Sequence, residues 1–175
     1  MSEITITLKV KELIYDVTNK TYLTGRSREA EGSKNYEASS NMQASEDEEN
    51  SYQIRRSLSN AFSSVKSALS EYLLDSSTSS DNLISEAIDE DGELELQFSM
   101  PSNFSTSSVS ALGNSIHSYL VDIALADWFS ITNKEDAETY IAHSALSLES
   151  AKRSLYKRKR PTRPNYNDVD ADDAL

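Results

Sequence analysis

Apolar residues recur at helical spacing between residues 106 and 160, and this pattern constrains the fold more than any other feature of the chain. Along residues 106–131 they fall on two faces of one helix. The first face holds Val109, Leu112, Ile116, Tyr119, Leu120 and Ile123, and the second holds Val121, Leu125, Trp128 and Phe129. A helix that is apolar on two faces is usually central in a bundle, or is also buried against a neighbouring subunit. We therefore expect residues 106–131 to occupy one of these two positions.

A second long helix is predicted over residues 133–160. Thr132 can cap it, with Glu135 at the third helical position completing a capping box. Its apolar residues form a narrow seam that includes small side chains: Ala137, Tyr140, Ile141, Ser144, Leu148, Ala151 and Leu155. Such a seam allows close antiparallel packing against the preceding helix.

Two strands are predicted from strict alternation of apolar and polar residues, one over residues 4–10 and one over residues 93–100. The second strand follows Asp91-Gly92, which is a turn signal. It needs a partner because a two-stranded hairpin is marginal alone. The N-terminal strand and the segment 82–88 are both candidates for that partner.

A further helix is predicted over residues 46–74, where Ser45 and Glu48 can form a capping box. After the N-terminal strand we expect a short helix ending near Asn19 and a loop around Gly25. The stretch 24–27, "TGRS", is expected to be a plain turn, with an anion-binding turn as the alternative.

Two polar segments are expected to lie outside the core. Residues 29–50 show no core pattern and are predicted to be a long loop or arm. Pro161 and Pro164 are expected to end the last helix, leaving residues 161–175 as a flexible acidic tail. The expected fold is mainly α: one helical domain over residues 1–160, a bundle with a long antiparallel C-terminal helix pair, a small β-sheet or hairpin and extended arms.

Imidazole and thiol side chains are scarce in this chain, and its abundant carboxylates specify no site by themselves. There are two histidines and no cysteine, and the four glycines never cluster as a phosphate-binding or dinucleotide-binding loop requires. His117, Asp122 and Asp127 are spaced by five, which places successive members about 140° apart around a helix. His143 is expected at the boundary of the core. We predict no catalytic, metal or cofactor site, no cofactor and no enzymatic activity, unless the fold brings a histidine beside several carboxylates in a pocket.

The charge balance limits the partners. The formal net charge is -12, which disfavours non-specific binding to DNA or to an anionic membrane. No stretch reaches the roughly 20 apolar residues of a membrane helix, and the N-terminus lacks the basic and apolar regions of a secretory signal. We expect no contact with membranes.

One basic cluster stands against this acidic background. It holds seven of the 17 Lys and Arg residues: Lys152, Arg153, Lys157, Arg158, Lys159, Arg160 and Arg163. Cations at a helix C-terminus complement its dipole, which accounts for two or three of them. We expect the cluster to wrap the helix end and to meet acidic protein surface, such as residues 46–49 or 170–173 of a neighbouring copy. Contact with DNA is the alternative.

Trp128 and Phe129 are the other candidate interaction residues. Filling the core of the bundle is the favoured interpretation of both. As anchors of a subunit interface they would follow the enrichment of aromatic residues at such surfaces.

The chain contains a specific pattern, H-x-Y-L-V-x-x-x-L-x-D-W-F, then NKEDA-x-x-Y, then KR-x-RP-x-RP, which begins at His117 and ends at Pro164. In this pattern, and along nearly its whole length, it resembles small virion proteins encoded by tailed phages and prophages of gut Bacteroides-type bacteria. More generally it is similar to head-tail connector adaptors, small helical proteins with extended arms or a small sheet. The resemblance assigns no residue a chemical role.

The resemblance implies a non-enzymatic component of the virion neck, made in the cytoplasm of the bacterial host. Its copies would form a ring, often twelvefold, that contacts the portal and other neck and tail proteins and lets DNA pass. A tail-completion or tail-tube-associated virion protein is the second expectation. A third is a nucleic-acid-binding regulator that uses residues 152–163.

Overall fold

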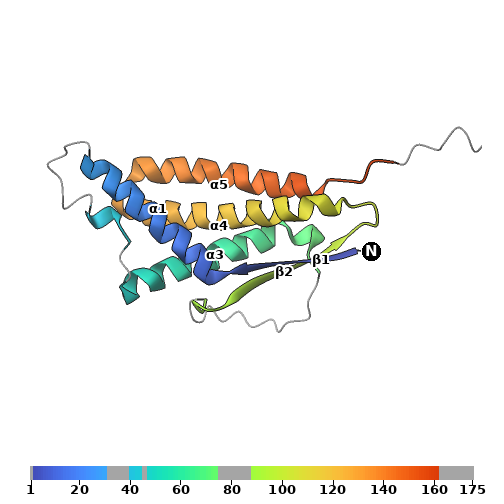
Figure 1. Cartoon of the computed structure of the whole chain (residues 1–175), viewed down its shortest axis with the longest axis horizontal. Coiled ribbons are helices and arrows are strands. Elements are labelled where there is room, and N and C mark those ends of the chain that lie inside the picture. Colours follow the sequence, from blue (N-terminus) through green and yellow to red (C-terminus); the bar gives the residue numbers. More distant parts are fainter. Residues whose placement is uncertain (1, 31–39, 45–46, 75–87, 162–175) are drawn as a thin grey trace, which may run out of the picture.

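The computed structural model describes residues 2–30, 40–44, 47–74 and 88–161. The chain is mostly helical with one small antiparallel sheet, as the sequence predicts (Figure 1). The elements in chain order are β1 (Ser2–Lys9), α1 (Val10–Ala30), α3 (Glu48–Ala68), β2 (Glu93–Met100), α4 (Val109–Thr132) and α5 (Lys134–Leu155), with 3-10 turns at Ser70–Tyr72 and Thr106–Ser108. In Figure 1, α5 lies along one side of α4, α3 lies on the other side, and α1 crosses the bundle obliquely.

Helix α4 is the central element of the bundle. It contacts α1, α3, α5 and β1. Its buried side chains lie on nearly every side of the helix: Leu112, Ile116, Tyr119, Leu120, Val121, Asp122, Ala124, Leu125, Ala126 and Phe129. The prediction of a central position is therefore confirmed within a single chain.

Helix α5 packs antiparallel on α4, and this confirms the predicted C-terminal helix pair. The predicted cap is wrong by one residue, because Thr132 is the last residue of α4 and Asn133 caps α5. The Asn133 Oδ1 accepts a hydrogen bond from the Glu135 N–H at 3.2 Å, and its Nδ2 donates to Asp136 Oδ2 at 2.7 Å. An extended residue is needed between two helices, and Asn133 with φ -156° supplies it.

The last helix is shorter than predicted. It ends at Leu155, before either proline; Tyr156 forms a turn, and residues 157–161 continue outside the helix. They run beside residues 103–105: the Ser105 N–H donates to Lys157 O at 3.1 Å, and the Lys159 N–H donates to Asn103 O at 2.7 Å. These main-chain hydrogen bonds replace the next helical turn, so α5 is about 33 Å long at 1.5 Å per residue.

The sheet pairs β1 with β2, which resolves the choice of partner. Leu8 lies opposite Leu94, and Ile4 lies opposite Phe98. The inner face of β2 is buried through Leu94, Leu96, Phe98 and Met100, as strict alternation predicts. The rival segment 82–88 lies outside the described residues except for residue 88.

Gly92 closes the turn that leads into β2. Its N–H donates to Asp89 O at 3.1 Å, and its carbonyl accepts from the Val10 N–H at 3.1 Å. A Cβ at this position would lie 3.0 Å from Asp89 O, so the backbone approach favours glycine. The predicted turn at Asp91-Gly92 is confirmed.

The short helix and the loop predicted after the first strand are both wrong. Helix α1 continues to Ala30, passing through Asn19 and Gly25 without a break. Residues 24–27 are helical, so neither the plain turn nor the anion-binding turn exists. The buried residues Val10, Leu13, Val17 and Thr21 lie three or four apart and hold this helix on the bundle.

Helix α3 begins one residue after Asp47, which occupies the N-cap position predicted for Ser45. Its buried residues Ile54, Leu58, Ala61 and Val65 recur at helical spacing, and the helix ends at Ala68, before the predicted end at residue 74. The prediction that residues 29–50 form an arm is wrong at the parts that the structure describes. Residues 29–30 belong to α1, residues 48–50 belong to α3, and Ala44 is buried against the bundle. Residues 31–39, 45–46 and 162–175, the last of these being most of the predicted tail, lie outside the described residues.

Candidate interaction surfaces

The basic cluster lies partly on α5 and partly beyond it. Lys152 and Arg153 are in the last turn of the helix, whereas residues 157–160 lie on the extended segment beside residues 103–105. The expectation that the bases wrap a helix end is therefore wrong for Lys157, Arg158, Lys159 and Arg160. Arg163 lies outside the described residues. All six described members are exposed to solvent.

The backbone of this segment is fixed while most of its charges remain available. Arg153 Nη2 lies 2.6 Å from Glu149 Oε1, so that charge is already paired on the helix surface. The Arg158 Nη1 donates to Leu155 O at 2.7 Å and caps the end of α5. We name the exposed residues 152–160 the basic end.

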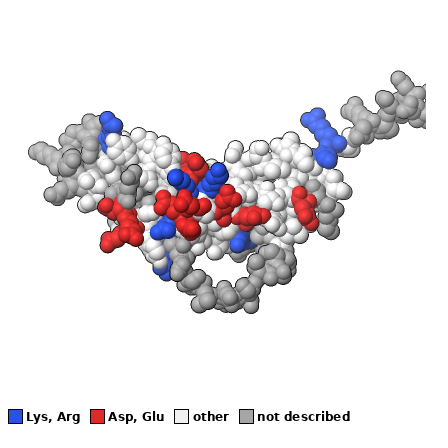
Figure 2. All heavy atoms as spheres, turned by 60° about the horizontal axis from the view of Figure 1, so that its bottom comes forward, with Lys and Arg blue, Asp and Glu red and all other residues white. Residues whose placement is uncertain are grey.

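Acidic side chains gather elsewhere on the molecule. Glu93 and Glu95 point outward from β2, and residues 89–91 of the preceding turn are also acidic and exposed. Figure 2 shows acidic side chains across the middle of this face with basic side chains among them, and a separate basic group at one end. We name residues 89–95 the acidic turn. The acidic turn lies at the start of β2, and the basic end pairs with residues 103–105 just beyond its last residue, so the two groups lie near opposite ends of this strand.

Trp128 and Phe129 both pack within the chain. Phe129 is fully buried and stacks on Tyr140 with ring centroids 5.6 Å apart. Trp128 is half-buried, and its Nε1–H donates to Met42 O at 2.9 Å. Phe129 therefore has no exposed surface to offer another subunit in this conformation, and Trp128 ties residues 40–44 to α4.

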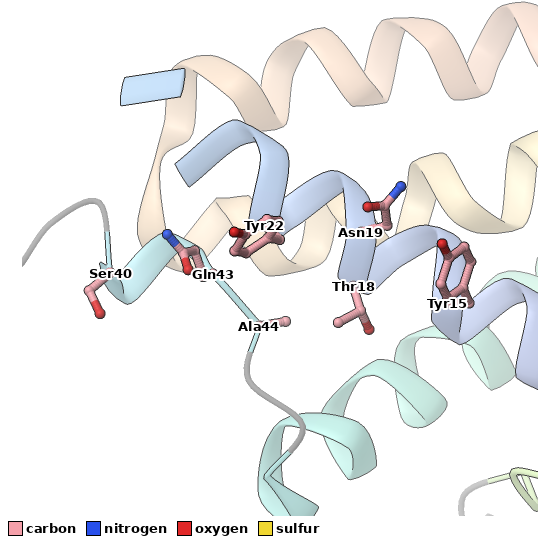
Figure 3. A pocket seen from close by; sticks show the side chains of 7 residues that line it. All are labelled: Tyr15, Thr18, Asn19, Tyr22, Ser40, Gln43 and Ala44. Atoms are coloured by element: carbon pink, nitrogen blue, oxygen red, sulfur yellow. The ribbon is translucent and has the colours of Figure 1, made fainter. Parts of the chain in front are cut away.

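A hollow of about 430 Å³ lies beside α1 (Figure 3). Its walls are Tyr15, Thr18, Asn19 and Tyr22 from α1, facing Ser40, Gln43 and Ala44. The described residues of this lining offer hydroxyl and amide groups and two phenol rings, and none of them is a carboxylate, histidine or lysine. Such a surface can form hydrogen bonds and stack on a ring.

The histidines and carboxylates considered for a metal site diverge in space. His117 Nε2 lies 3.6 Å from Asp16 Oδ2, Asp127 is exposed, and Asp122 is buried against other residues. Neither His117 nor His143 lines the hollow beside α1. Within the described parts of the chain, no group of three or more metal-ligating side chains converges. His143 is exposed and touches the edge of the Tyr140 ring.

Asp122 is the one buried carboxylate among the described residues. It lies where α1, α4 and α5 meet, with 7% of its surface exposed. Burial raises its pKa above the ordinary 3.8, while Lys20, Ser147 and His143 act in the opposite direction. Lys20 Nζ lies 3.9 Å from Asp122 Oδ1, and the Ser147 hydroxyl donates to Oδ2 at 3.3 Å. Sequence spacing alone does not show this burial, because Lys20 comes from a helix about a hundred residues earlier in the chain.

Comparisons with protein-family models, curated proteins and solved structures found no match to this chain. Among the described residues, no helix combines the length and apolar character that crossing a membrane requires.

Proposed function

We propose that this chain is a non-enzymatic structural component of a phage virion, an adaptor of the neck. Its copies form a ring that joins the portal to the tail and lets DNA pass. The resemblance of residues 117–164 to small virion proteins motivates the class. The separation of the basic end from the acidic turn is the observation that supports assembly through repeated contacts between copies.

Charge separation favours head-to-tail contacts. When the basic end of one copy meets the acidic turn of the next, each copy uses two different surfaces. Contacts of this heterologous kind close into rings when the rotation between copies fits, and otherwise extend into filaments. Complementary charges also raise the rate of encounter and reject wrong orientations.

The acidic balance of the chain fits passage of DNA. A ring whose inner wall carries net negative charge repels phosphate and gives DNA no place to bind. Basic residues along the inner wall would contradict this part of the proposal.

Cryo-electron microscopy of intact phage particles tests the location and the copy number. The expected result is density for a ring of this fold between portal and tail. Density for the fold at the tail end or along the tail tube would instead support the second candidate, a tail-completion or tail-tube-associated protein.

A charge reversal tests the contact itself. Lys157, Lys159 and Arg160 replaced together by Glu should abolish ring formation measured by native mass spectrometry, with little change in the melting temperature. Arg158 is kept because it caps the end of α5. Combining this variant with a copy in which Glu93 and Glu95 are replaced by Lys should recover mixed assemblies. Normal rings from the reversed variant alone would contradict the proposed contact.

The third candidate, a nucleic-acid-binding regulator, predicts a different measurement. A regulator that uses the basic end would bind duplex DNA at physiological salt, with affinity falling steeply as salt increases. For the adaptor we expect no binding to duplex DNA tighter than about 1 μM under these conditions, near the stronger limit of non-specific affinity.

A further inference from the structure

Strand β1 lies at an edge of the sheet. Figure 1 shows both strands on the side of the bundle away from α5. Among the described residues, β1 pairs with β2 alone. The far side of β2 is partly occupied, because the Leu74 N–H donates to Gln97 O at 2.9 Å. We name the side of β1 that is turned away from β2 the outer edge.

The hydrogen bonds of the sheet decide which main-chain groups point to the outer edge. Opposite residues of an antiparallel pair alternate between hydrogen-bonded and non-bonded pairs. The Val10 N–H donates to Gly92 O at 3.1 Å and continues the register of the ladder, so the even-numbered positions of β1 bond to β2. Gln97, which lies opposite Thr5, directs its carbonyl to Leu74 and away from β1, as this alternation requires. The N–H and C=O groups that point to the outer edge are those of Glu3, Thr5, Thr7 and Lys9.

The side chains of β1 alternate between the core and solvent. Ile6 is buried against Gly113 of α4, and Ile4 and Leu8 are half-buried on the same face. Edge strands usually resist pairing with other chains through a proline, a bulge or a charge within the strand. Between Ile4 and Leu8, β1 has none of these. The exposed side chains on the other face are those of Glu3, Thr5, Thr7 and Lys9.

The two charges of β1 stand at its two ends, and their order makes the strand complementary to itself. When a second β1 runs antiparallel with Ile6 opposite Ile6, Glu3 of each copy lies opposite Lys9 of the other. Lys9 also lies opposite Glu93 of its own chain, so it would stand between two carboxylates. A parallel arrangement would set Glu3 against Glu3 and Lys9 against Lys9, and like charges directly opposite each other destabilise a sheet.

The same antiparallel register satisfies the main chain. It sets Thr5 opposite Thr7 of the other copy, so groups that point to the outer edge meet one another and about eight hydrogen bonds can form. A shift by one residue would turn the apolar side chains of the second strand to the wrong face. A shift by two residues in either direction would separate Glu3 from Lys9 and shorten the ladder.

We infer that the free protein forms a two-fold dimer in which the outer edges of two β1 strands pair antiparallel and build one four-stranded sheet. The occupant of the outer edge is a second copy of the chain. A two-fold contact closes on itself and differs from the head-to-tail contact between copies in a ring, so the inference does not rest on the proposed function. The interface is small, and we expect a dissociation constant on the order of 10 μM.

Proline at an outward position tests the pairing. Thr5→Pro removes an N–H that points to the outer edge and leaves the bonds between β1 and β2 in place. In sedimentation equilibrium of the full chain, this variant should associate at least about tenfold more weakly than the wild type. Thr5→Ala keeps the N–H and is the matched control, with association within about threefold of the wild type. A wild type that is monomeric at about 100 μM, or a Thr5→Pro variant that dimerises as well as Thr5→Ala, would overturn the inference.

Amide hydrogen exchange of the wild type gives a test that does not depend on the folding of Thr5→Pro. The Ile6 amide bonds to β2 and should exchange slowly at both about 1 μM and about 100 μM protein. The Thr5 and Thr7 amides should be protected only at the higher concentration. Fast exchange of these two amides in a sample that sediments as a dimer would place the contact on another surface and contradict the pairing.

Exchanging the charges tests the register. Glu3→Lys and Lys9→Glu should each weaken the homodimer at least about threefold, since like charges then lie opposite each other. The two variants mixed together should form a heterodimer in native mass spectrometry, because every charged pair is again of opposite sign. If either single variant associates as tightly as the wild type, Glu3 and Lys9 do not face each other in the dimer.

Discussion

At Asp122, the cost of burying a charged side chain competes with the favourable contacts of that charge. Its carboxylate lies at the junction of three helices, and burial opposes its ionisation more than Lys20 and Ser147 favour it. A carboxyl group whose pKa is raised by folding stabilises the fold while it is protonated. That contribution is complete below the ordinary pKa of 3.8 and is lost as pH rises through the folded-state pKa.

Asp122→Asn is expected to be at least as stable as the wild type at pH 7. The amide keeps an acceptor for the Ser147 hydroxyl and removes the cost of burying a charge. The difference between variant and wild type should shrink as pH falls toward about 4, and urea unfolding at several pH values measures it. Asp127→Asn, an exposed carboxylate on the same helix, is the control and should change stability little. If Asp122→Asn were clearly less stable at pH 7, the Lys20 contact would outweigh the cost of burial.

Trp128 is a second side chain whose effect reaches beyond its own helix. Its indole N–H donates to Met42 O, while Ala44 N–H donates to Thr21 Oγ1 at 3.2 Å. Together these bonds hold residues 40–44 against α1 and α4. The sequence indicates an arm there because Met42 and Ala44 are too few to form an apolar pattern.

Trp128→Phe should cost about 0.5–1.5 kcal/mol, since it removes one hydrogen bond and some packing. Hydrogen exchange of the Ala44 amide should become faster, whereas exchange along α5 should not change. Equal protection of Ala44 in both proteins would show that Trp128 does not hold this segment.

At the scale of elements, the sequence correctly predicts those helices and strands that a local pattern of residues determines. Strand β2 matches its predicted residues because strict alternation and a turn fix it locally. The antiparallel pair α4 and α5 follows from apolar seams of full helical length. Helix α1 exceeds its predicted end because its buried stripe continues through polar sequence to Thr21. The end of α5 depends on hydrogen bonds to residues 103–105, which no local pattern reveals.

The link between α4 and α5 gives a prediction for a single element boundary. Asn133→Ala should reduce the free energy of unfolding by about 1 kcal/mol, because the first turn of α5 loses its side-chain acceptor. Thr132→Ala should cost less, since its hydroxyl only returns to Trp128 O at 3.3 Å within α4. Thermal unfolding of both variants compares them. A larger loss of unfolding free energy for Thr132→Ala than for Asn133→Ala would instead support the predicted capping box at Thr132.

Across the whole molecule, the distribution of charge matters more for the proposed assembly than the net charge does. The chain is acidic overall, yet six exposed bases of residues 152–160 lie together at one end, apart from the acidic turn. The sequence shows both sets of charges, but only the fold places them far apart. The sequence also assigns Ile141 to the seam against α4, whereas the fold leaves this side chain more than half exposed.

Assembly through these charges should depend strongly on ionic strength. Raising salt from about 0.05 M to 0.5 M shortens the screening length several-fold and weakens exposed charge pairs. We expect ring formation, followed by light scattering, to slow at least tenfold over this range. Assembly that is indifferent to salt would indicate an apolar contact in place of the proposed one.

The short pairing of residues 157–159 with residues 103–105 has a mechanical consequence. Any pull on the chain beyond residue 161 acts first on the bonds Ser105 N to Lys157 O and Lys159 N to Asn103 O. Those bonds join the end of α5 to the entry of α4, so tension is shared by both long helices and does not unwind either one from its tip.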